Sequence, residues 1–180
     1  MNTYISLLRG INVGPTKTVK MGDLVVLYES QGLSNVRAYL RSGNVLFDSP
    51  YTDPKKLSVL LEEQINRSLG FQVKVLLRTG DELQRIISSN PFLQGVYRDT
   101  STLHVTFLSD DPSPESVSEV SAIQDEVDSI VIKGMEVYLF CPHGYGRTSF
   151  SNTFFEKKLG VVATTRNWKT VTALATMARR

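Results

Sequence analysis

The residues best suited to chemistry in this chain gather in two polar clusters, each directly after an apolar segment. In the first cluster, Arg9-Gly10-Ile11-Asn12-Val13-Gly14 is joined by Arg41-Ser42-Gly43-Asn44. Arginine forks suit phosphate or carboxylate, and glycine lets the backbone approach an anion. Tight turns with left-handed asparagines would account for the same residues equally well, so both interpretations stay open. The candidate ligand-binding residues here are Arg9, Asn12, Arg41, Ser42 and Asn44.

The second cluster follows an apolar segment that ends at Phe140. A glycine-rich loop leads from there into an expected helix that begins at Asn152, and the free amides of a helix N-terminus attract anions. Arg147 would strengthen that attraction, whereas Ser151 is expected to cap the helix. The polar stretch 164–170 adds Arg166, for which the sequence suggests no structural task, and an expected N-cap at Asn167. The candidate ligand-binding residues here are Arg147, Asn152, Glu156, Arg166 and Asn167.

Catalytic groups are sparse, and the sequence identifies no catalytic residue. A serine nucleophile needs a neighbouring base, but the chain has two histidines: His104 inside an expected strand and His143 in the glycine-rich loop. Glu156 is embedded among basic residues and is suited to general-base catalysis. It is also suited to an ion pair with Arg147 or Arg166, which is the favoured interpretation. Asn152 and Glu156 are four residues apart, so they share a helix face.

Several classes of site are excluded by the composition. One cysteine, Cys141, rules out an internal disulfide, and two histidines make a structural zinc site very improbable. No carboxylate cluster indicates Mg²⁺ or Ca²⁺, so neither a metal nor a cofactor is expected. The segment Gly10–Gly14 lacks the pattern of a phosphate loop or of a dinucleotide fingerprint. No apolar run is long enough for a membrane span and the start is not that of a signal peptide, so a cytoplasmic protein without membrane partners is expected.

Charge is unevenly distributed along the 180 residues, although the net charge is only +2. Residues 110–136 hold eight acids and one base, whereas residues 143–180 hold seven bases and one acid. An acidic run is usually a solvated face. The basic segment is interleaved with Asn, Ser, Thr and aromatic residues, which is more typical of a binding surface.

The order of expected elements indicates an α+β protein of two ferredoxin-like subdomains with an extra C-terminal helix. Residues 1–78 predict the order β-α-β-β-α-β, and a similar order returns over 102–180. Residues 79–101 are expected to form a short helix and a connector with turns at Gly95 and Arg98. In a ferredoxin-like sheet the end of strand one lies beside the start of strand three. Arg9 and Gly10 are therefore expected next to the segment 41–44.

Several motifs resemble the bacterial "domain of unknown function 1697" family along essentially the whole chain. They are Leu7-Leu8-Arg9-Gly10-Ile11-Asn12-Val13-Gly14, Met21 with Leu24, Tyr39-x-x-Ser42-Gly43-Asn44-Val45, Phe155-Glu156-Lys157-Lys158-Leu159-Gly160 and Thr165-Arg166-Asn167-Trp168-Lys169-Thr170-Val171. The resemblance implies two ferredoxin-like subdomains. It implies no activity and no site residues. Pro15 stands where the family tends to have a second glycine, which makes this loop stiffer.

Three functions are compatible with these features. The first is a protein that binds an anionic ligand, with nucleic acid or nucleotide phosphate as the leading class, at an inter-subdomain surface. In one form of it, Arg37, Tyr39 and Arg41 share an open sheet face with Lys74 and Arg78 and bind a single strand. The second is a small enzyme acting on a phosphorylated or carboxylated metabolite with Glu156 or His143 as acid or base. The third is a structural or interaction protein whose open sheet faces pack together or dimerise.

Overall fold

A computed structural model describes residues 1–94 and 99–179 of the chain. The chain forms two compact units, one made of Met1–Gln84 with Leu174–Arg180 and the other of Arg85–Ala173. Each unit contains one four-stranded antiparallel sheet, which confirms the α+β class. The expected division into 1–78, a connector over 79–101, and 102–180 stays a prediction. The expected turns at Gly95 and Arg98 lie outside the described residues.

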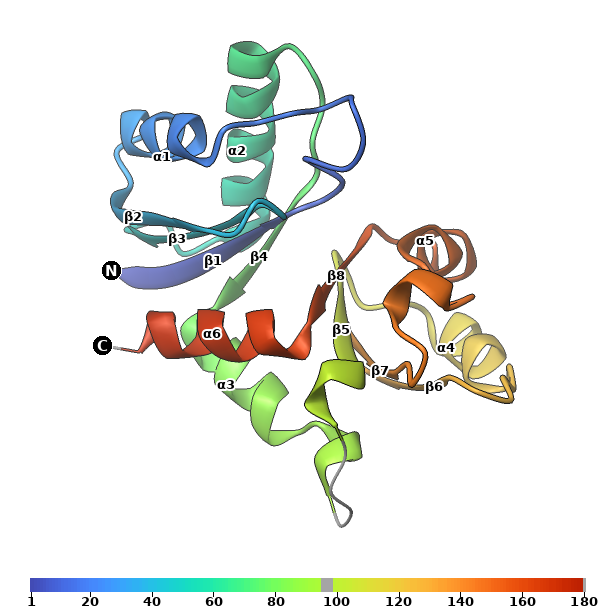
Figure 1. The fold of residues 1–180 in the computed structure, drawn as a ribbon. Coiled ribbons are helices and arrows are strands. Elements are labelled where there is room, and N and C mark those ends of the chain that lie inside the picture. Colours follow the sequence, from blue (N-terminus) through green and yellow to red (C-terminus); the bar gives the residue numbers. More distant parts are fainter. Residues whose placement is uncertain (95–98, 180) are drawn as a thin grey trace. The chain divides into compact units, whose positions relative to one another are not determined.

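The first unit is built on a sheet with the strand order β2-β3-β1-β4 (Figure 1). Its central strand β1 is antiparallel to β3 on one side and to β4 on the other. Helices α1 and α2 cover one face of this sheet. The elements are β1 (Asn2–Leu8), α1 (Met21–Ser30), β2 (Ser34–Tyr39), β3 (Asn44–Ser49), α2 (Pro54–Leu69) and β4 (Val75–Thr79).

Local sequence signals explain where these elements begin and end. The Asp53 side chain accepts hydrogen bonds from the backbone N–H groups of Lys55 and Lys56, and Pro54 starts α2. Helix α2 ends at Gly70, whose φ of 76° is left-handed. Between these ends, the apolar residues at helical spacing are buried against the sheet: Leu57, Leu61 and Ile65.

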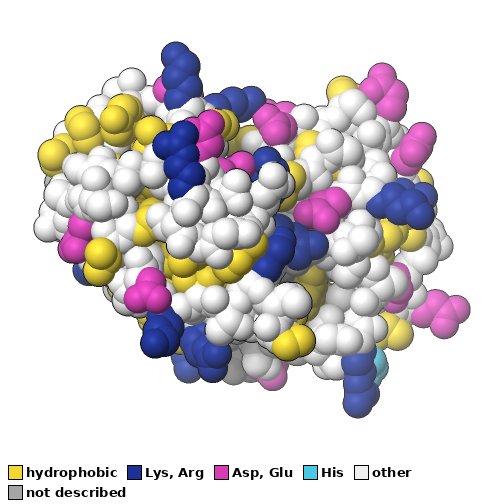
Figure 2. All heavy atoms as spheres, turned by 90° about the horizontal axis from the view of Figure 1, so that it is seen from above, with side chains coloured by type: hydrophobic (Ala, Val, Ile, Leu, Met, Phe, Trp, Pro, Cys, Tyr) yellow, Lys and Arg dark blue, Asp and Glu magenta, His cyan; other side chains and the backbone are white. Residues whose placement is uncertain are grey.

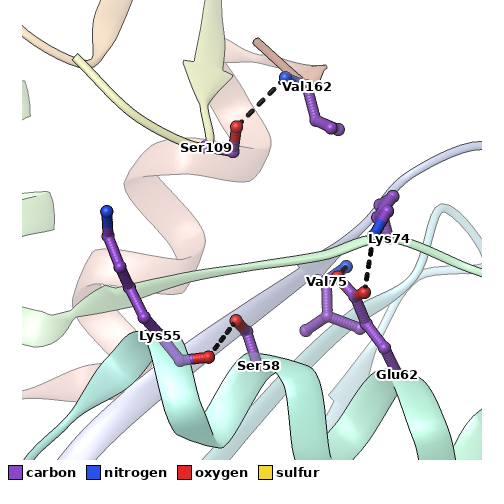
Figure 3. Close-up of polar contacts among 7 residues, drawn as sticks. All are labelled: Lys55, Ser58, Glu62, Lys74, Val75, Ser109 and Val162. Carbon is purple, nitrogen blue, oxygen red and sulfur yellow. Dashed lines mark hydrogen bonds and ion pairs between the residues drawn. The ribbon is translucent and has the colours of Figure 1, made fainter.

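The second unit repeats this layout with the strand order β6-β7-β5-β8 and with α4 and α5 on one face (Figure 1). Its strands and helices are β5 (Leu103–Leu108), α4 (Pro114–Ser121), β6 (Ser129–Lys133), β7 (Glu136–Phe140), α5 (Asn152–Leu159) and β8 (Ala163–Asn167). Short 3₁₀ turns occur at Pro91–Leu93, Thr100–Thr102 and Tyr145–Arg147. Beyond β5 and β8, two hydrogen bonds join Ser109 and Val162. The N–H of Ser109 donates to the carbonyl oxygen of Val162, and the N–H of Val162 donates to Oγ of Ser109, which is the bond drawn in Figure 3.

Two helices follow the last strands of the two sheets. Helix α3 (Gly80–Ser88) follows β4, and helix α6 (Trp168–Ala178) follows β8. The division between the units passes through both of them. The short helix expected after residue 78 is present, and a capping box starts it, because Glu82 accepts the N–H of Thr79 and Thr79 accepts the N–H of Glu82. No helix of the described residues is long and apolar enough to cross a bilayer.

Two expectations about the first sheet are wrong. Strand β2 ends at Tyr39, and Leu40 is a turn residue with φ 58° and 52% exposure, so Arg41 does not continue the alternation of Arg37 and Tyr39. The face opposite α1 and α2 is also not open at its centre. Ile5 and Leu7 are fully buried there, and Arg78 is 3% exposed. Because both faces of β1 are buried at its centre, this sheet cannot offer a surface on which bases stack. The hypothesis that single-stranded nucleic acid binds on the sheet face is therefore not supported.

Candidate functional site

The first polar cluster forms where the end of β1 meets the turn before β3. Leu7 pairs with Asn44 in the antiparallel register, and the N–H of Leu8 donates to the carbonyl oxygen of Gly43 at 2.9 Å. This places loop 9–20 next to turn 40–43, as the expected strand order predicted. We call these two segments the loop pair.

Asn12 holds the loop pair together. Its side-chain Nδ2 donates to the carbonyl oxygens of Arg41 at 2.7 Å and Val19 at 3.0 Å, while its Oδ1 accepts the N–H of Val19 at 2.8 Å. Its backbone N–H donates to the carbonyl oxygen of Lys17, and its φ is 55°. Asparagine tolerates this left-handed conformation better than most residues do. Asn12 is therefore a structural tie, and the amide is not available to a ligand.

Gly43 is needed because the turn packs closely against Leu8 and Ile11. Its φ is 84°, and a Cβ atom there would lie 2.7 Å from Cδ1 of Ile11 and 2.9 Å from Cβ of Leu8. Ile11 is 1% exposed and fills the space beneath the loop. The first glycine-rich motif thus serves close packing at this position.

Asn44 and Ser42 close the turn itself. Asn44 is fully buried, and its Nδ2 donates to the carbonyl oxygen of Tyr39 at 2.8 Å and to Oγ of Ser42 at 3.0 Å. These bonds account for the asparagine and the serine without a ligand. Of the two arginines in this cluster, Arg41 is exposed and Arg9 is partly buried.

The loop pair carries basic residues and no acidic ones. Arg9, Lys17, Lys20 and Arg41 lie in these segments, whereas Asp and Glu are absent from them. The lysines and Arg41 are exposed and have no ion-pair partner among the described residues. The backbone N–H groups of Val13 and Gly14 likewise have no hydrogen-bond partner within the described part of the chain. On the face shown in Figure 2, basic and acidic side chains are interspersed.

Lys74 lies beside the loop pair but contributes little charge to it. The N–H of Arg9 donates to the carbonyl oxygen of Lys74, and Nζ of Lys74 forms an ion pair with Glu62 at 2.9 Å (Figure 3). The same carboxylate accepts the N–H of Val75 at 3.0 Å. Glu62 therefore neutralises Lys74 while fixing the first residue of β4.

In the second unit, Asn152 and Glu156 share one face of α5, as expected, and both side chains contact β8. Oδ1 of Asn152 accepts from Oγ1 of Thr165 at 2.6 Å, and Oε1 of Glu156 accepts the N–H of Ala163 at 3.1 Å. The hydroxyl of Tyr145 donates to Oγ1 of Thr165 at 3.1 Å. These contacts tie α5 and the preceding loop to the sheet, which gives both candidates a structural task.

The sequence suggested no structural task for Arg166, but the structure buries this residue, which is only 6% exposed. Its NH1 donates to Oγ1 of Thr164 at 2.8 Å and to the carbonyl oxygen of Thr165 at 2.9 Å. Burial lowers the pKa of Arg166 to about 10, which still leaves it charged at neutral pH. Successive strand residues face opposite sides, so Arg166 lies on the face opposite Ala163 and α5. The sheet therefore lies between Arg166 and the helix that carries Glu156, which disfavours an ion pair between these two residues. The alternative pair of Glu156 with Arg147 stays a prediction.

Asn167 and Ser151 have the expected capping roles. Oδ1 of Asn167 accepts the N–H of Thr170 at 2.8 Å, at the start of α6. Oγ of Ser151 accepts the N–H of Phe154 at 3.1 Å, so one of the free amides of α5 is already satisfied. Both residues are accounted for by helix capping.

The glycine-rich loop of the second unit is flanked by acids. Arg147 is exposed, but Oγ of Ser149 donates to Asp125 at 3.3 Å. Burial, with further contributions from Asp128 and Asp125, raises the pKa of the Cys141 thiol to about 11. The thiol is thus protonated and buried, and the local field disfavours an anion.

His104 packs inside the second unit. Its ring stacks on Tyr145 with centroids 5.2 Å apart, it is 9% exposed, and burial lowers its pKa. Nδ1 has no hydrogen-bond partner of good geometry among the described residues. His143 is exposed in the neighbouring loop. No group of three His, Cys, Asp or Glu side chains in the described chain is arranged to hold a metal ion.

The ten candidates fall into two sets of five, one in each unit. Arg9, Asn12, Arg41, Ser42 and Asn44 come together in the first unit. Asn152, Glu156, Arg166 and Asn167 line β8 or its end, and Arg147 lies in the loop before α5. Their convergence on one surface stays a prediction. The sequence-based prediction did not include Lys17 and Lys20, although both stand in the polar segment that directly follows Arg9–Gly14.

Comparison with known proteins places the chain among proteins of undefined activity. A family model described as "Protein of unknown function (DUF1697)" matches residues 1–138. The chain is similar in structure to the conserved bacterial protein SP0830 from Streptococcus pneumoniae, with a TM-score of 0.79 and 22% sequence identity. That similarity covers 100% of this chain and 99% of the other. No curated protein sequence matches.

Proposed function

Since the chain belongs to the DUF1697 family of proteins of unknown function, we propose a function from its own residues: it binds a phosphate-bearing ligand at the loop pair. The single observation that carries this proposal is that the exposed basic residues Lys17, Lys20 and Arg41 lie on the two tied segments that also carry the backbone amides of Val13 and Gly14, unpaired within the described chain, with no acid among them. Guanidinium and ammonium groups bind phosphate through charge-assisted hydrogen bonds, and backbone amides add to them.

The rigidity of the loop pair supports this function. Asn12 fixes both segments through three side-chain hydrogen bonds, and Pro15 restricts the backbone further. A preorganised loop loses less conformational entropy when it binds, so more of the interaction energy appears as affinity. The exposed apolar side chains of Val13, at 74%, and Leu40, at 52%, offer contact to a base or a sugar beside the phosphate.

Nucleic acid and free nucleotide are two sources of the same phosphate chemistry, and a titration separates them. The probes are a fluorescent oligothymidylate, ATP and inorganic phosphate, each titrated into the full chain at two salt concentrations. A nucleic acid ligand gives oligonucleotide affinity that falls steeply with salt, because counterions are released. A nucleotide ligand gives ATP affinity at least equal to that of the oligonucleotide. The absence of saturable binding for all three probes would refute the proposal.

Charge-neutral variants test the site itself. Arg41→Gln and Lys17→Gln are each expected to weaken binding by about tenfold or more, because each removes one charge-assisted contact. Arg67→Gln on α2 is the matched control, since Arg67 is exposed and distant in sequence from the loop pair. Equal affinity of all three variants would place the site elsewhere.

An enzyme using Glu156 or His143 draws less support from the contacts. The Glu156 carboxylate accepts a backbone N–H of β8, which occupies an oxygen that a general base would need. His143 is exposed and has no hydrogen-bond partner within the described residues. The anion-binding function is therefore the one that we carry forward.

For the fold, we infer that both units are ferredoxin-like and descend from one duplicated unit. The corresponding strand orders support this, and so does a repeated contact. Glu62 of α2 accepts the N–H of Val75 in β4, and Glu156 of α5 accepts the N–H of Ala163 in β8. Val75 pairs with Leu8 and Ala163 pairs with Leu108, the corresponding last residues of β1 and β5.

A further inference from the structure

The first unit is hollowed beside Thr3, near the start of β1, whereas the loop pair follows the end of β1. A cavity of about 620 Å³ opens between the edge of the first sheet and residues 177–179. All of its lining residues belong to the first unit, and its polar groups come from four elements. Its volume falls in the range of about 300–1,000 Å³ that small-molecule sites occupy.

The floor of the cavity is organised by a buried carboxylate. Asp48 is 4% exposed and accepts Oγ1 of Thr3 at 2.7 Å and Nδ2 of Asn35 at 2.6 Å. Strand β2 carries a bulge between Ser34 and Arg37, and Asn35 has a φ of 52° within it. Bulges re-aim side chains beside functional sites, and here the bulge places an asparagine over the buried carboxylate.

The contacts of Asn35 determine which of its atoms is left for a ligand. A carboxylate only accepts, so the Asn35 amide must present its Nδ2 to Asp48. Its carbonyl oxygen Oδ1 has no hydrogen-bond partner among the described residues. Asp48 therefore acts as a positioning residue, and Asn35 lines the cavity with an acceptor.

The wall of the cavity carries both signs of charge. One N–H of the Arg37 guanidinium donates to the carbonyl oxygen of Met177 at 3.0 Å, near the end of α6. That bond is the only one that the Arg37 side chain makes within the described chain, and it orients the other donors of the guanidinium group. Glu29 at the end of α1 lines the same cavity, and its carboxylate makes no hydrogen bond or ion pair with another described residue.

We propose that this cavity binds a small zwitterion that carries one ammonium and one carboxylate group, in the way of a free amino acid or a dipeptide. The Glu29 carboxylate and Oδ1 of Asn35 accept from the ammonium group. The Arg37 guanidinium donates to the ligand carboxylate in forked geometry. A simple anion would meet the fields of Glu29 and Asp48, and a simple cation would meet those of Arg37 and Arg179, so the mixed lining favours a ligand with both charges.

The test uses the full chain and probes that differ in one charge. Alanine and alanyl-alanine are titrated by calorimetry, beside N-acetylalanine, which lacks the ammonium, and alaninamide, which lacks the carboxylate. At least one zwitterion is expected to bind with a Kd below about 10 mM, and each single-charge analogue about tenfold or more weakly. No saturable binding, or equal binding of the single-charge analogues, would overturn the proposal.

Variants locate the binding. Arg37→Gln and Glu29→Gln are expected to reduce affinity by about tenfold or more, while Arg37→Lys keeps the charge and loses only the fork. The matched controls are Arg67→Gln and Glu63→Gln, which neutralise exposed residues on α2 outside the cavity. Thermal melts of every variant verify folding. Binding that survives both cavity substitutions would refute the assignment, and phosphate binding at the loop pair is expected to be unchanged by them.

Discussion

The side-chain amide of Asn12 donates a 2.7 Å hydrogen bond to the carbonyl oxygen of Arg41, 29 residues further along the chain. This bond joins two segments that each contain left-handed residues, Asn12 and Lys17 on one side and Leu40 on the other. Backbone in this conformation persists where the surrounding structure holds it. The bond therefore explains how the basic residues of the loop pair keep a fixed arrangement.

Asn12→Ala is expected to lower the free energy of unfolding by about 2–4 kcal/mol. Three hydrogen bonds are lost, and alanine takes a left-handed conformation at a cost of about 1–2 kcal/mol. Urea denaturation measures the change. Asn66→Ala, at an exposed position of α2, is the matched control and is expected to change stability by about 0.5 kcal/mol or less. Equal stability of the two variants would show that Asn12 is not a tie.

Gly43→Ala is expected to destabilise more than Gly14→Ala. Both glycines have positive φ, 84° and 72°, so both substitutions carry a conformational cost. Only at Gly43 would the new Cβ meet other atoms, Ile11 Cδ1 at 2.7 Å and Leu8 Cβ at 2.9 Å. The expected difference is about 1–3 kcal/mol, the usual cost of overpacking, measured by urea denaturation. An equal loss at both positions would contradict the packing argument.

Arg166→Ala is expected to destabilise the protein by about 2–4 kcal/mol, because it empties a buried site and removes the hydrogen bonds to Thr164 and Thr165. Arg147→Ala, at an exposed position, is expected to change stability by about 0.5 kcal/mol or less. A urea melt of each variant provides the comparison. If Arg166→Ala unfolds like the parent, its guanidinium has no structural task, and the ligand-binding role becomes the better explanation.

Stability is expected to fall as the pH drops below about 6.5, the ordinary pKa of histidine. Burial lowers the pKa of His104 in the folded state, so below that pH the unfolded chain binds a proton that the folded chain resists. His104→Phe keeps a ring against Tyr145 and is expected to remove this dependence between pH 7.5 and 5. His143→Phe is the control, because His143 is exposed and should leave the slope unchanged. Identical slopes in both variants and the parent would exclude His104 as the cause.

Glu62→Ala and Glu156→Ala are expected to destabilise by similar amounts, about 1–2 kcal/mol each. Each carboxylate accepts one backbone N–H at the start of a sheet's fourth strand, so each deletion leaves one amide without its partner. Glu63→Ala provides the baseline, since Glu63 is exposed on the same helix as Glu62. Denaturant melts measure the free energy of unfolding of each variant. A loss of stability in only one of the two variants would contradict the proposed equivalence of Glu62 and Glu156.

Much of the candidate site could be located from the sequence, but its chemistry could not. The strand order placed Arg9 beside the segment 41–44, and the register of β1 and β3 confirms that placement. The tasks of Asn12 and Asn44 were left open between ligand and turn, and their hydrogen bonds now favour the turn. Their partners include the backbone of distant residues, which no residue pattern encodes.

Local signals by themselves determined where this chain forms its elements. Asp53, Thr79 with Glu82, Ser151 and Asn167 each cap a helix that the sequence predicted. A cap involves residues two or three positions apart, and a helix or strand is recognised by its apolar spacing, so both can be read from a short window. One exception is β2, which ends at Tyr39, so the alternation of Arg37, Tyr39 and Arg41 does not hold to its last member.

Burial and side-chain partners were decided only by the tertiary structure. Arg166 has the sequence surroundings of an exposed binding residue, yet it is buried because its strand is covered on both faces. The sequence shows that Asp48 follows the apolar residues Val45-Leu46-Phe47 of a strand. It does not show that the carboxylate accepts hydrogen bonds from Thr3 and Asn35. The bulge that brings Asn35 there depends on the register between two strands. Register and burial are set by packing among segments distant in sequence, which is why local patterns do not determine them.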